Sequence, residues 1–248
     1  MSGEKHPNKM LTIAPEPVRC FACQARQNSE WSNLNDDEVR LLNDAKICNV
    51  YRAGQTIFYQ GNPAVGVYCI ESGTVALKKL DSHGNQVITR LYHAGHTLGY
   101  RTFFSGGFYG ASAEALSDSR ICFVESRTVT KLLSQNPSLG LSFLNHLAKD
   151  LGTAEDSMMH MNTLPVRVRL SHLLLTLKDD YGQMRDDGTL ELDLPLSRQD
   201  LASMIAVRPE TLSRTIRSME DDNVALFKKR RVIVPDLDRL LDELEDSE

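Results

Sequence analysis

Residues 197–220 read SRQDLASMIAVRPETLSRTIRSME. Ser197, with Asp200 three residues later, forms a capping box that predicts the start of a helix, and Pro209 suits the first turn of a second helix. Apolar residues recur at helical spacing and can close a core between the two helices: Leu201, Ile205, Leu212, Ile216 and Met219. The stretch therefore predicts a helix-turn-helix unit.

The exposed face of the predicted second helix carries side chains suited to reading DNA. Arg214 and Arg217 belong to the residue type that most often binds guanine. Glu210 can accept a hydrogen bond from cytosine, and Ser213 can contact a base or a phosphate. These side chains near the start of a recognition helix predict sequence-specific contact with double-stranded DNA.

A basic run follows the helix-turn-helix, at residues 228–231, and the apolar residues 232–234 come directly after it. Residues 197–231 hold eight basic and five acidic side chains, whereas the whole chain has a net charge of −5. The run is either a solvated turn or a wing over the DNA phosphates, and the motif upstream favours the wing. The candidate DNA contacts are Arg198, Glu210, Ser213, Arg214, Arg217, Lys228, Lys229, Arg230 and Arg231.

Upstream, between residues 47 and 125, short β-branched and aromatic runs alternate with turn signals. The runs cover 56–59, 65–70, 75–77 and 86–89. Glycine-containing turns recur about every ten residues, which is typical of a small β barrel or jelly roll. A short helix is predicted before this region, at 31–45, with Asn35 as its N-cap.

A long helix is predicted after Pro137, because apolar residues there alternate in steps of three and four. They are Leu144, Leu147, Leu151, Ala154, Met158 and Met161. Such a narrow stripe is typical of the seam between two paired helices. The alternative is a surface helix that packs on its own domain. The seam interpretation predicts a homodimer.

The chain is thus expected to be an α+β protein with four parts. They are a cysteine-bearing arm without regular structure (1–30), a sensory β domain (31–136), a dimerisation helix (137–164) and a winged helix-turn-helix domain (165–248).

Composition narrows the function classes. The chain has 41% hydrophobic and 25% charged residues, the balance of an ordinary soluble protein. It has no apolar run of about 18 residues and no secretory h-region, so we expect no membrane partner and a cytoplasmic location. The odd number of cysteines, five, together with the expected cytoplasmic location, argues against a disulfide framework. No nucleophile–base pair or complete metal triad predicts an enzyme.

The order of parts resembles the Crp/Fnr family of bacterial transcription regulators, and the segment 210–214 is similar to the E-x-x-S-R motif of its FNR branch. The resemblance implies a β domain like those that bind cyclic nucleotides. It also implies a homodimer that reads TTGAT half-sites in an inverted repeat, with RNA polymerase as a partner. Two positions depart from the pattern: Ala206 replaces the usual turn glycine, and Arg208 replaces the usual Ser or Thr cap.

The cysteines are the candidate effector site. Cys20 and Cys23 have the C-x-x-C spacing of metal ligands. By the resemblance, they would hold a [4Fe–4S] cluster together with Cys122. The family's remaining cysteine falls near Ser29, so Cys48 is the candidate replacement, with an oxygen or nitrogen ligand as the alternative.

Other effectors remain open: a thiol switch, haem or a small molecule. Cys69 is interpreted as a core residue. The glutamate and arginine that hold a cyclic nucleotide in the family are missing around residues 98–103. A cyclic-nucleotide-type regulatory subunit acting on a protein partner is therefore the less favoured alternative.

Overall fold

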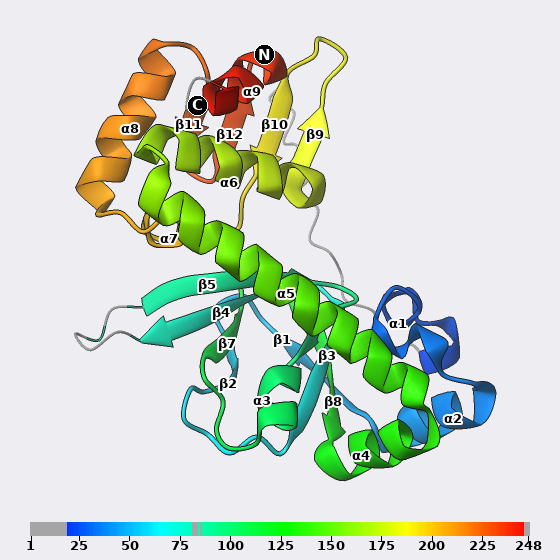
Figure 1. The fold of residues 1–248 in the computed structure, drawn as a ribbon. Coiled ribbons are helices and arrows are strands. Elements are labelled where there is room, and N and C mark those ends of the chain that lie inside the picture. The colour runs from blue at the N-terminus through cyan, green and yellow to red at the C-terminus, as the bar shows by residue number, and fades with distance from the viewer. Residues whose placement is uncertain (1–18, 81–83, 85, 246–248) are drawn as a thin grey trace. The chain divides into compact units, whose positions relative to one another are not determined.

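The structure is a computed structural model, and it describes residues 19–80, 84 and 86–245 (Figure 1). The chain divides into two compact units. The first contains residues up to 76 and 91–143, and the second contains 77–90 and the residues from 144 onward. The first 18 residues, with most of the predicted arm, and the predicted turn around 83–85 lie partly or wholly outside the described residues.

Two four-stranded sheets form the β domain. One has the order β1-β8-β3-β6, with β1 (Ile47–Tyr51), β8 (Ser119–Glu125), β3 (Gly66–Ser72) and β6 (Thr97–Leu98). The other has the order β2-β7-β4-β5, with β2 (Thr56–Phe58), β7 (Ser112–Ala115), β4 (Thr74–Leu80) and β5 (Gln86–His93). All four strand runs expected from the sequence overlap observed strands, which confirms the predicted β domain.

Gly73 shows why a turn residue was needed between β3 and β4. Its φ of 94° lies in the left-handed region, and an added Cβ would come within 2.1 Å of the Ser119 Oγ. Any other residue would be strained there and would collide with the start of β8.

Helices cover one face of the β1-β8-β3-β6 sheet. They are η1 (Cys20–Ala22), α1 (Gln24–Gln27), η2 (Glu30–Asn33), α2 (Asp36–Ala45), α3 (Tyr100–Ser105) and α4 (Ser126–Gln135). The expected cap is confirmed, because Asn35 and Glu38 form a reciprocal capping box at α2. A buried core joins these helices to Val67 of β3 and Val124 of β8.

The predicted long helix is α5 (Pro137–Thr163), and Pro165 separates it from α6 (Val166–Tyr181). Pro165 lies at the N-cap position of α6, where the missing N–H of proline is tolerated. No described helix combines the length and apolar character needed to cross a membrane.

The second unit contains the helix-turn-helix, formed by α7 (Arg198–Met204) and α8 (Pro209–Asp221). Its sheet has the order β11-β12-β10-β9. The remaining elements are β9 (Gly182–Met184), β10 (Leu190–Asp193), β11 (Leu226–Lys228), β12 (Arg231–Val234) and α9 (Leu237–Glu245). The predicted capping box is present, since Ser197 Oγ accepts from the Asp200 N–H and the Asp200 carboxylate accepts from the Ser197 N–H.

Arg167 ties α6 to two other helices of this unit. Its guanidinium donates two hydrogen bonds to Glu243 of α9, at 2.5 and 2.7 Å. It also donates to Ser218 of α8 at 2.8 Å and pairs with Asp222 just after that helix. These hydrogen bonds to Glu243 and Asp222 raise the pKa of Arg167, so the charge persists at all physiological pH values. A bidentate arginine–carboxylate contact is also geometrically specific, and it fixes α9 against α6.

The turn between α7 and α8 is strained at Ala206, whose φ is 54°. We expect Ala206→Gly to raise the free energy of unfolding by about 1 kcal/mol, because glycine enters the left-handed region without steric cost. Chemical denaturation of the wild type and the variant measures the difference. Ala225→Gly, at a buried position with no positive φ, is the control and should destabilise. An unchanged or lower stability of Ala206→Gly would contradict the assigned strain.

Candidate functional site

Three cysteines lie in one row across the sheet. The register pairs Cys48 of β1 with Cys122 of β8, and Cys122 in turn with Cys69 of β3. Directly opposed residues in antiparallel strands share a face of the sheet. Cys122 is therefore flanked by a cysteine on each side.

The N-terminal segment folds over this row. The sequence analysis expected no regular structure before residue 30, but residues 20–27 form η1 and α1. Cys20 is buried, and its N–H donates to Asn43 Oδ1 at 3.1 Å. Arg26 donates to the Cys20 carbonyl at 2.8 Å and to the Trp31 carbonyl at 2.9 Å. Sequence reasoning missed this segment because its short helices carry no periodic apolar pattern, and the core in which Cys20 is buried includes residues distant in the chain.

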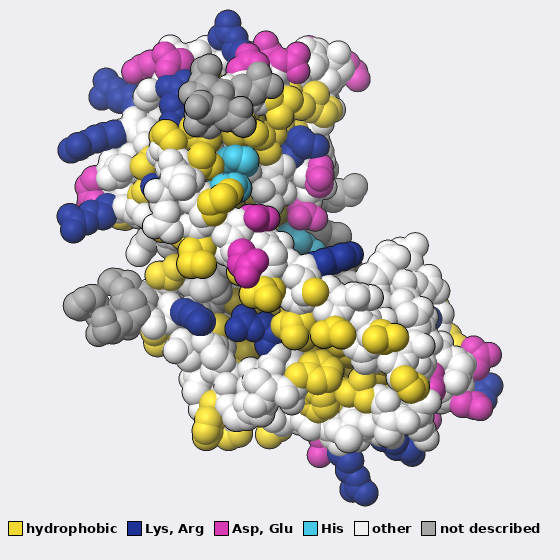
Figure 2. All heavy atoms as spheres, in the orientation of Figure 1, with side chains coloured by type: hydrophobic (Ala, Val, Ile, Leu, Met, Phe, Trp, Pro, Cys, Tyr) yellow, Lys and Arg dark blue, Asp and Glu magenta, His cyan; other side chains and the backbone are white. Residues whose placement is uncertain are grey.

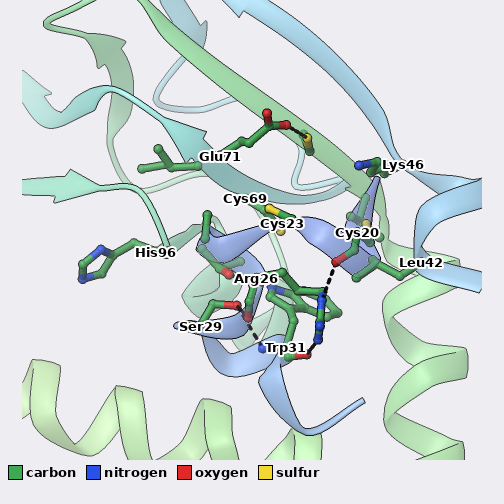
Figure 3. Close-up of a pocket in the computed structure, with 16 residues that line it drawn as sticks. Cys20, Cys23, Arg26, Ser29, Trp31, Leu42, Lys46, Cys69, Glu71 and His96 are labelled. Carbon is green, nitrogen blue, oxygen red and sulfur yellow. Dashed lines mark hydrogen bonds between the residues drawn. The ribbon is translucent and has the colours of Figure 1, made fainter. Parts of the chain in front are cut away.

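One pocket gathers cysteines from both sources. Cys20, Cys23, Cys69 and Cys122 line it, and it is partly open to solvent. Arg26, Lys46, Glu71 and His96 supply its polar rim. Figure 3 shows Cys20, Cys23 and Cys69 near its centre, whereas the His96 ring points away from them. The structure thus brings together three predicted ligands, Cys20, Cys23 and Cys122, with one residue that was interpreted as core.

Burial favours the protonated form of two thiols in this pocket, Cys69 and Cys20. Burial raises the pKa of Cys69, and the nearby Glu30 carboxylate raises it further. Burial also raises the pKa of Cys20, although the positive charge of Lys46 opposes the effect. A metal that binds here would have to displace these protons, so its affinity would increase with pH.

Cys48 and Cys122 are joined by a disulfide, with a Cα–Cα distance of 3.9 Å. The expectation against disulfides is wrong for this pair, because the register of β1 and β8 places the two residues directly opposite each other. Glu71 lies beside the bond, with its Oε2 3.6 Å from the Cys122 sulfur. While the bond is closed, neither cysteine offers a thiolate to a metal.

Ser29 also lines the pocket, at the position where the family resemblance implies a cysteine. Its hydroxyl donates to the Arg26 carbonyl at 2.7 Å and accepts from the Trp31 N–H at 3.2 Å. Ser29 therefore serves as the N-cap of η2. The hydroxyl is engaged with the backbone.

Aromatic side chains fill the space between the two sheets. Phe58 stacks on Tyr109 with ring centroids 4.2 Å apart, and Tyr68 packs against Phe123 at 5.0 Å. The Tyr109 hydroxyl donates to the Gly66 carbonyl at 2.9 Å. Burial raises the pKa of Tyr68 to about 12, so this cluster stays neutral. A neutral aromatic cluster supplies neither of the charged groups that hold a ribose and a cyclic phosphate.

The predicted DNA-reading residues lie on the surface of the second unit. Glu210, Ser213, Arg214 and Arg217 are exposed on α8, whose opposite face buries Leu212, Ile216 and Met219. Arg208, at the N-cap of α8, makes no side-chain capping bond, as its residue type led us to expect. The exposed face of α8 is thus available to a DNA groove.

The basic run forms the connection between β11 and β12. Lys228 and Arg231 are paired across the hairpin, and Lys229 and Arg230 form its exposed tip. Arg231 lies 3.6 Å from Glu191 of β10, so part of its charge is offset within the domain. The tip has the geometry of a wing.

Two family models match the chain. Residues 48–136 match a cyclic nucleotide-binding domain, and residues 168–243 match a Crp-like helix-turn-helix domain. The chain belongs to the Crp/Fnr family of transcription regulators. It is therefore a DNA-binding transcription regulator.

Relatives in the Crp/Fnr family match over nearly the whole chain. A "Probable transcriptional activator" of Rhizobium leguminosarum bv. viciae is 29% identical over 225 residues, covering 90% of this chain and 92% of the relative. "Transcriptional activator protein FnrL" of Cereibacter sphaeroides is 25% identical, covering 92% and 93%. The solved structure of FixK2 from Bradyrhizobium japonicum superposes with a TM-score of 0.69 at 23% identity, covering 79% of this chain and 96% of that one.

Proposed function

We propose that this regulator responds to oxygen or cellular redox state through its cysteines. The observation that carries the proposal is the single pocket lined by Cys20 and Cys23 from the N-terminal segment and by Cys122 from the sheet. With the Cys48–Cys122 bond open, these residues would supply three of the four sulfur ligands that a [4Fe–4S] cluster requires. When bound, such a cluster would supply one-electron redox chemistry and sensitivity to oxygen.

A chain of contacts leads from this pocket to α5. Arg26 holds the Trp31 carbonyl, and the Trp31 ring meets the Phe143 ring edge-on, with centroids 5.4 Å apart. Asn33 donates to Ser142 of α5 at 3.0 Å. A change in the N-terminal segment would therefore act on α5 next to Leu144, the first residue of the apolar stripe. If the N-terminal segment became ordered or disordered, the change would be transmitted to α5, and such order–disorder transitions are a known way for proteins to switch between states.

We propose a second copy of the chain as the partner of that stripe. Leu144, Leu151 and Met158 are about 60% exposed, and the other three stripe residues are at least partly exposed. Figure 2 shows hydrophobic side chains gathered along the course of α5. Their three-four spacing is that of paired helices, and a homodimer would present two recognition helices to an inverted repeat.

We further propose a TTGAT-like inverted repeat as the DNA target and RNA polymerase as the protein partner. The E-x-x-S-R arrangement at 210–214 supports the first, and the names of two relatives as transcriptional activators support the second. A cytoplasmic, non-enzymatic role accords with the proposed DNA target and with RNA polymerase as the partner. The thiol switch, haem and a small molecule remain the alternative effectors.

Leu151→Glu should convert the dimer to a monomer, because the symmetry of the seam places two carboxylates face to face in an apolar contact. Sedimentation velocity measures the change. Thr153→Glu places the same charge at an exposed position off the stripe and should remain dimeric. A stable Leu151→Glu dimer would refute the seam.

Arg214→Ala should weaken binding to the specific site by about 1–3 kcal/mol and relax preference at one base pair, because a base contact is lost. Lys229→Ala should weaken specific and random DNA alike and reduce the salt dependence, because a phosphate contact is lost. Fluorescence anisotropy at several salt concentrations separates the two. Arg239→Ala, exposed on α9, is the matched control. Equal losses on specific and random DNA for Arg214→Ala would rule out base reading.

Cys20→Ala and Cys23→Ala should each abolish the difference in DNA affinity between protein prepared without oxygen and the same protein after exposure to air. The reason is that each removes a sulfur from the pocket. Ser29→Ala removes a hydroxyl from the same pocket and should retain the response. If both cysteine variants respond like the wild type, the N-terminal segment is not the sensor. The absorption spectrum of the anaerobic protein then distinguishes iron–sulfur, haem and colourless thiol chemistry.

A further inference from the structure

We propose that Cys122 has two mutually exclusive uses: as a ligand of a four-cysteine metal site that Cys69 completes, or in the disulfide with Cys48. The proposal rests on the proposed function for its biological meaning, but the metal site can be tested without DNA. It assigns a role to Cys69 and Cys48 that differs from the sequence expectation for both.

The position of Cys122 supports an exchange between these two uses, metal ligation and the disulfide with Cys48. It lies on the central strand of three, with Cys48 opposite on β1 and Cys69 opposite on β3. All three side chains are on the sheet face that the N-terminal segment covers. Rotation of the Cys122 side chain would therefore turn its sulfur toward Cys48 or toward Cys69 without any change in strand register.

Cys69 is the better fourth ligand because it shares the pocket with Cys20, Cys23 and Cys122. Cys48 does not line that pocket; it lies on β1, at the edge of the sheet. The Ser29 hydroxyl lines the pocket but is already bonded to backbone groups. Four thiolates are the donor set of structural zinc sites and of iron–sulfur clusters.

The charges around the pocket also suit a thiolate site. Arg26 and Lys46 line it, and both are cationic, so they would offset the negative charge of four thiolates around a divalent ion. Glu71 lies on the other side, with its Oε2 3.6 Å from the Cys122 sulfur, and its Oε1 lies 3.6 Å from the buried Arg120. The bonded sulfurs of Cys48 and Cys122 and a Glu71 oxygen lie within 4.8 Å of one another, so this trio becomes the competing ligand set once the disulfide is reduced. Among the described residues no three of Cys20, Cys23, Cys69 and Cys122 are that close, so metal binding would have to draw their side chains together.

Closing the disulfide needs an electron acceptor, for which we take a small disulfide such as oxidised glutathione. Cys122 leaves the metal, and its sulfur attacks the small disulfide and releases one small thiol. Cys48 then attacks the Cys122 sulfur of the mixed disulfide and releases the second small thiol. The Cys122 thiolate and the Cys48 thiol together lose two electrons and one proton; the small disulfide gains the two electrons and two protons, one from Cys48 and one from solvent. The metal ion is released, and the three remaining cysteine thiolates take up three protons from solvent.

Cobalt(II) is the probe for the metal site. The full-length protein is reduced with a phosphine under nitrogen and titrated with Co²⁺, whose thiolate charge-transfer and d–d bands report tetrahedral sulfur ligation. We expect one Co²⁺ per chain in the wild type, Cys48→Ser and Ser29→Ala. Cys69→Ser should bind at least about a hundredfold more weakly, since losing even an outer-shell partner costs ten- to a hundredfold.

Alkylation of the wild type keeps the test independent of whether the variants fold. Co²⁺ should protect Cys20, Cys23, Cys69 and Cys122 from iodoacetamide and leave Cys48 reactive, as mapped by mass spectrometry. Protection of Cys48 with Cys69 left reactive would overturn the assignment and favour the trio with Glu71. Unchanged Co²⁺ bands in Cys69→Ser would overturn it as well.

Oxidised glutathione tests the exchange. In the wild type it should remove the Co²⁺ bands while the Cys48–Cys122 cross-link appears, and in Cys48→Ser the bands should persist longer with no cross-link. Retention of Co²⁺ by protein whose disulfide is closed would refute the exchange. The outcomes separate from those of the proposed function: an intact Co²⁺ site with oxygen-independent DNA binding refutes only the sensor role. Oxygen-dependent DNA binding that persists in Cys69→Ser and Cys48→Ser refutes only the exchange.

Discussion

The pairing of β8 between β1 and β3 is the constraint on which the β domain depends. It brings together residues from three distant parts of the chain and sets Cys122 between two other cysteines. Because side chains alternate across a strand, the same register sends Ile121 to the opposite face from Cys122. A shift of one residue would move the cysteines away from the N-terminal segment and place them among the aromatic residues of the barrel.

The N-terminal segment covers this sheet face and forms a pocket that is partly open to solvent. Its backbone is fixed by the Arg26 side chain and by the buried Trp31, whose indole N–H donates to Thr97 at 2.9 Å. The Thr97 hydroxyl in turn donates to Glu30, also at 2.9 Å. Buried polar groups of this kind are stable only when every hydrogen-bond partner is present, so these bonds favour one position of the segment on the sheet. The segment also contacts α5, because the Trp31 ring packs against the Phe143 ring.

The DNA-binding unit differs from the β domain, because its candidate functional side chains are exposed on the surface of α8 and not buried in a pocket. Local signals define α7 and α8, whereas Arg167 joins α6 to α8 and α9 through charged hydrogen bonds. The exposed face of α8 carries polar side chains without disturbing the core beneath it. Among the described residues, three non-glycine residues have a positive φ: Ala206 in the turn after α7, Asn223 just after α8 and Lys229 at the wing tip. The unusual backbone conformations are therefore located at both ends of α8 and at the tip of the β11–β12 hairpin.

The sequence by itself determined the features that depend on near neighbours. The caps at Asn35 and Ser197, the turn before Pro209, the strands between 47 and 125 and the stripe on α5 all follow from spacings of a few residues, for which local hydrogen bonding and periodicity suffice. Cys20, Cys23 and Cys122 could be singled out by motif and resemblance. Only the tertiary structure decided that Cys69 joins them, that Cys48 bonds to Cys122, and that residues 20–27 are helical. These depend on strand register and on contacts between residues far apart in the chain, because side chains that meet across a sheet leave no fixed spacing in the sequence.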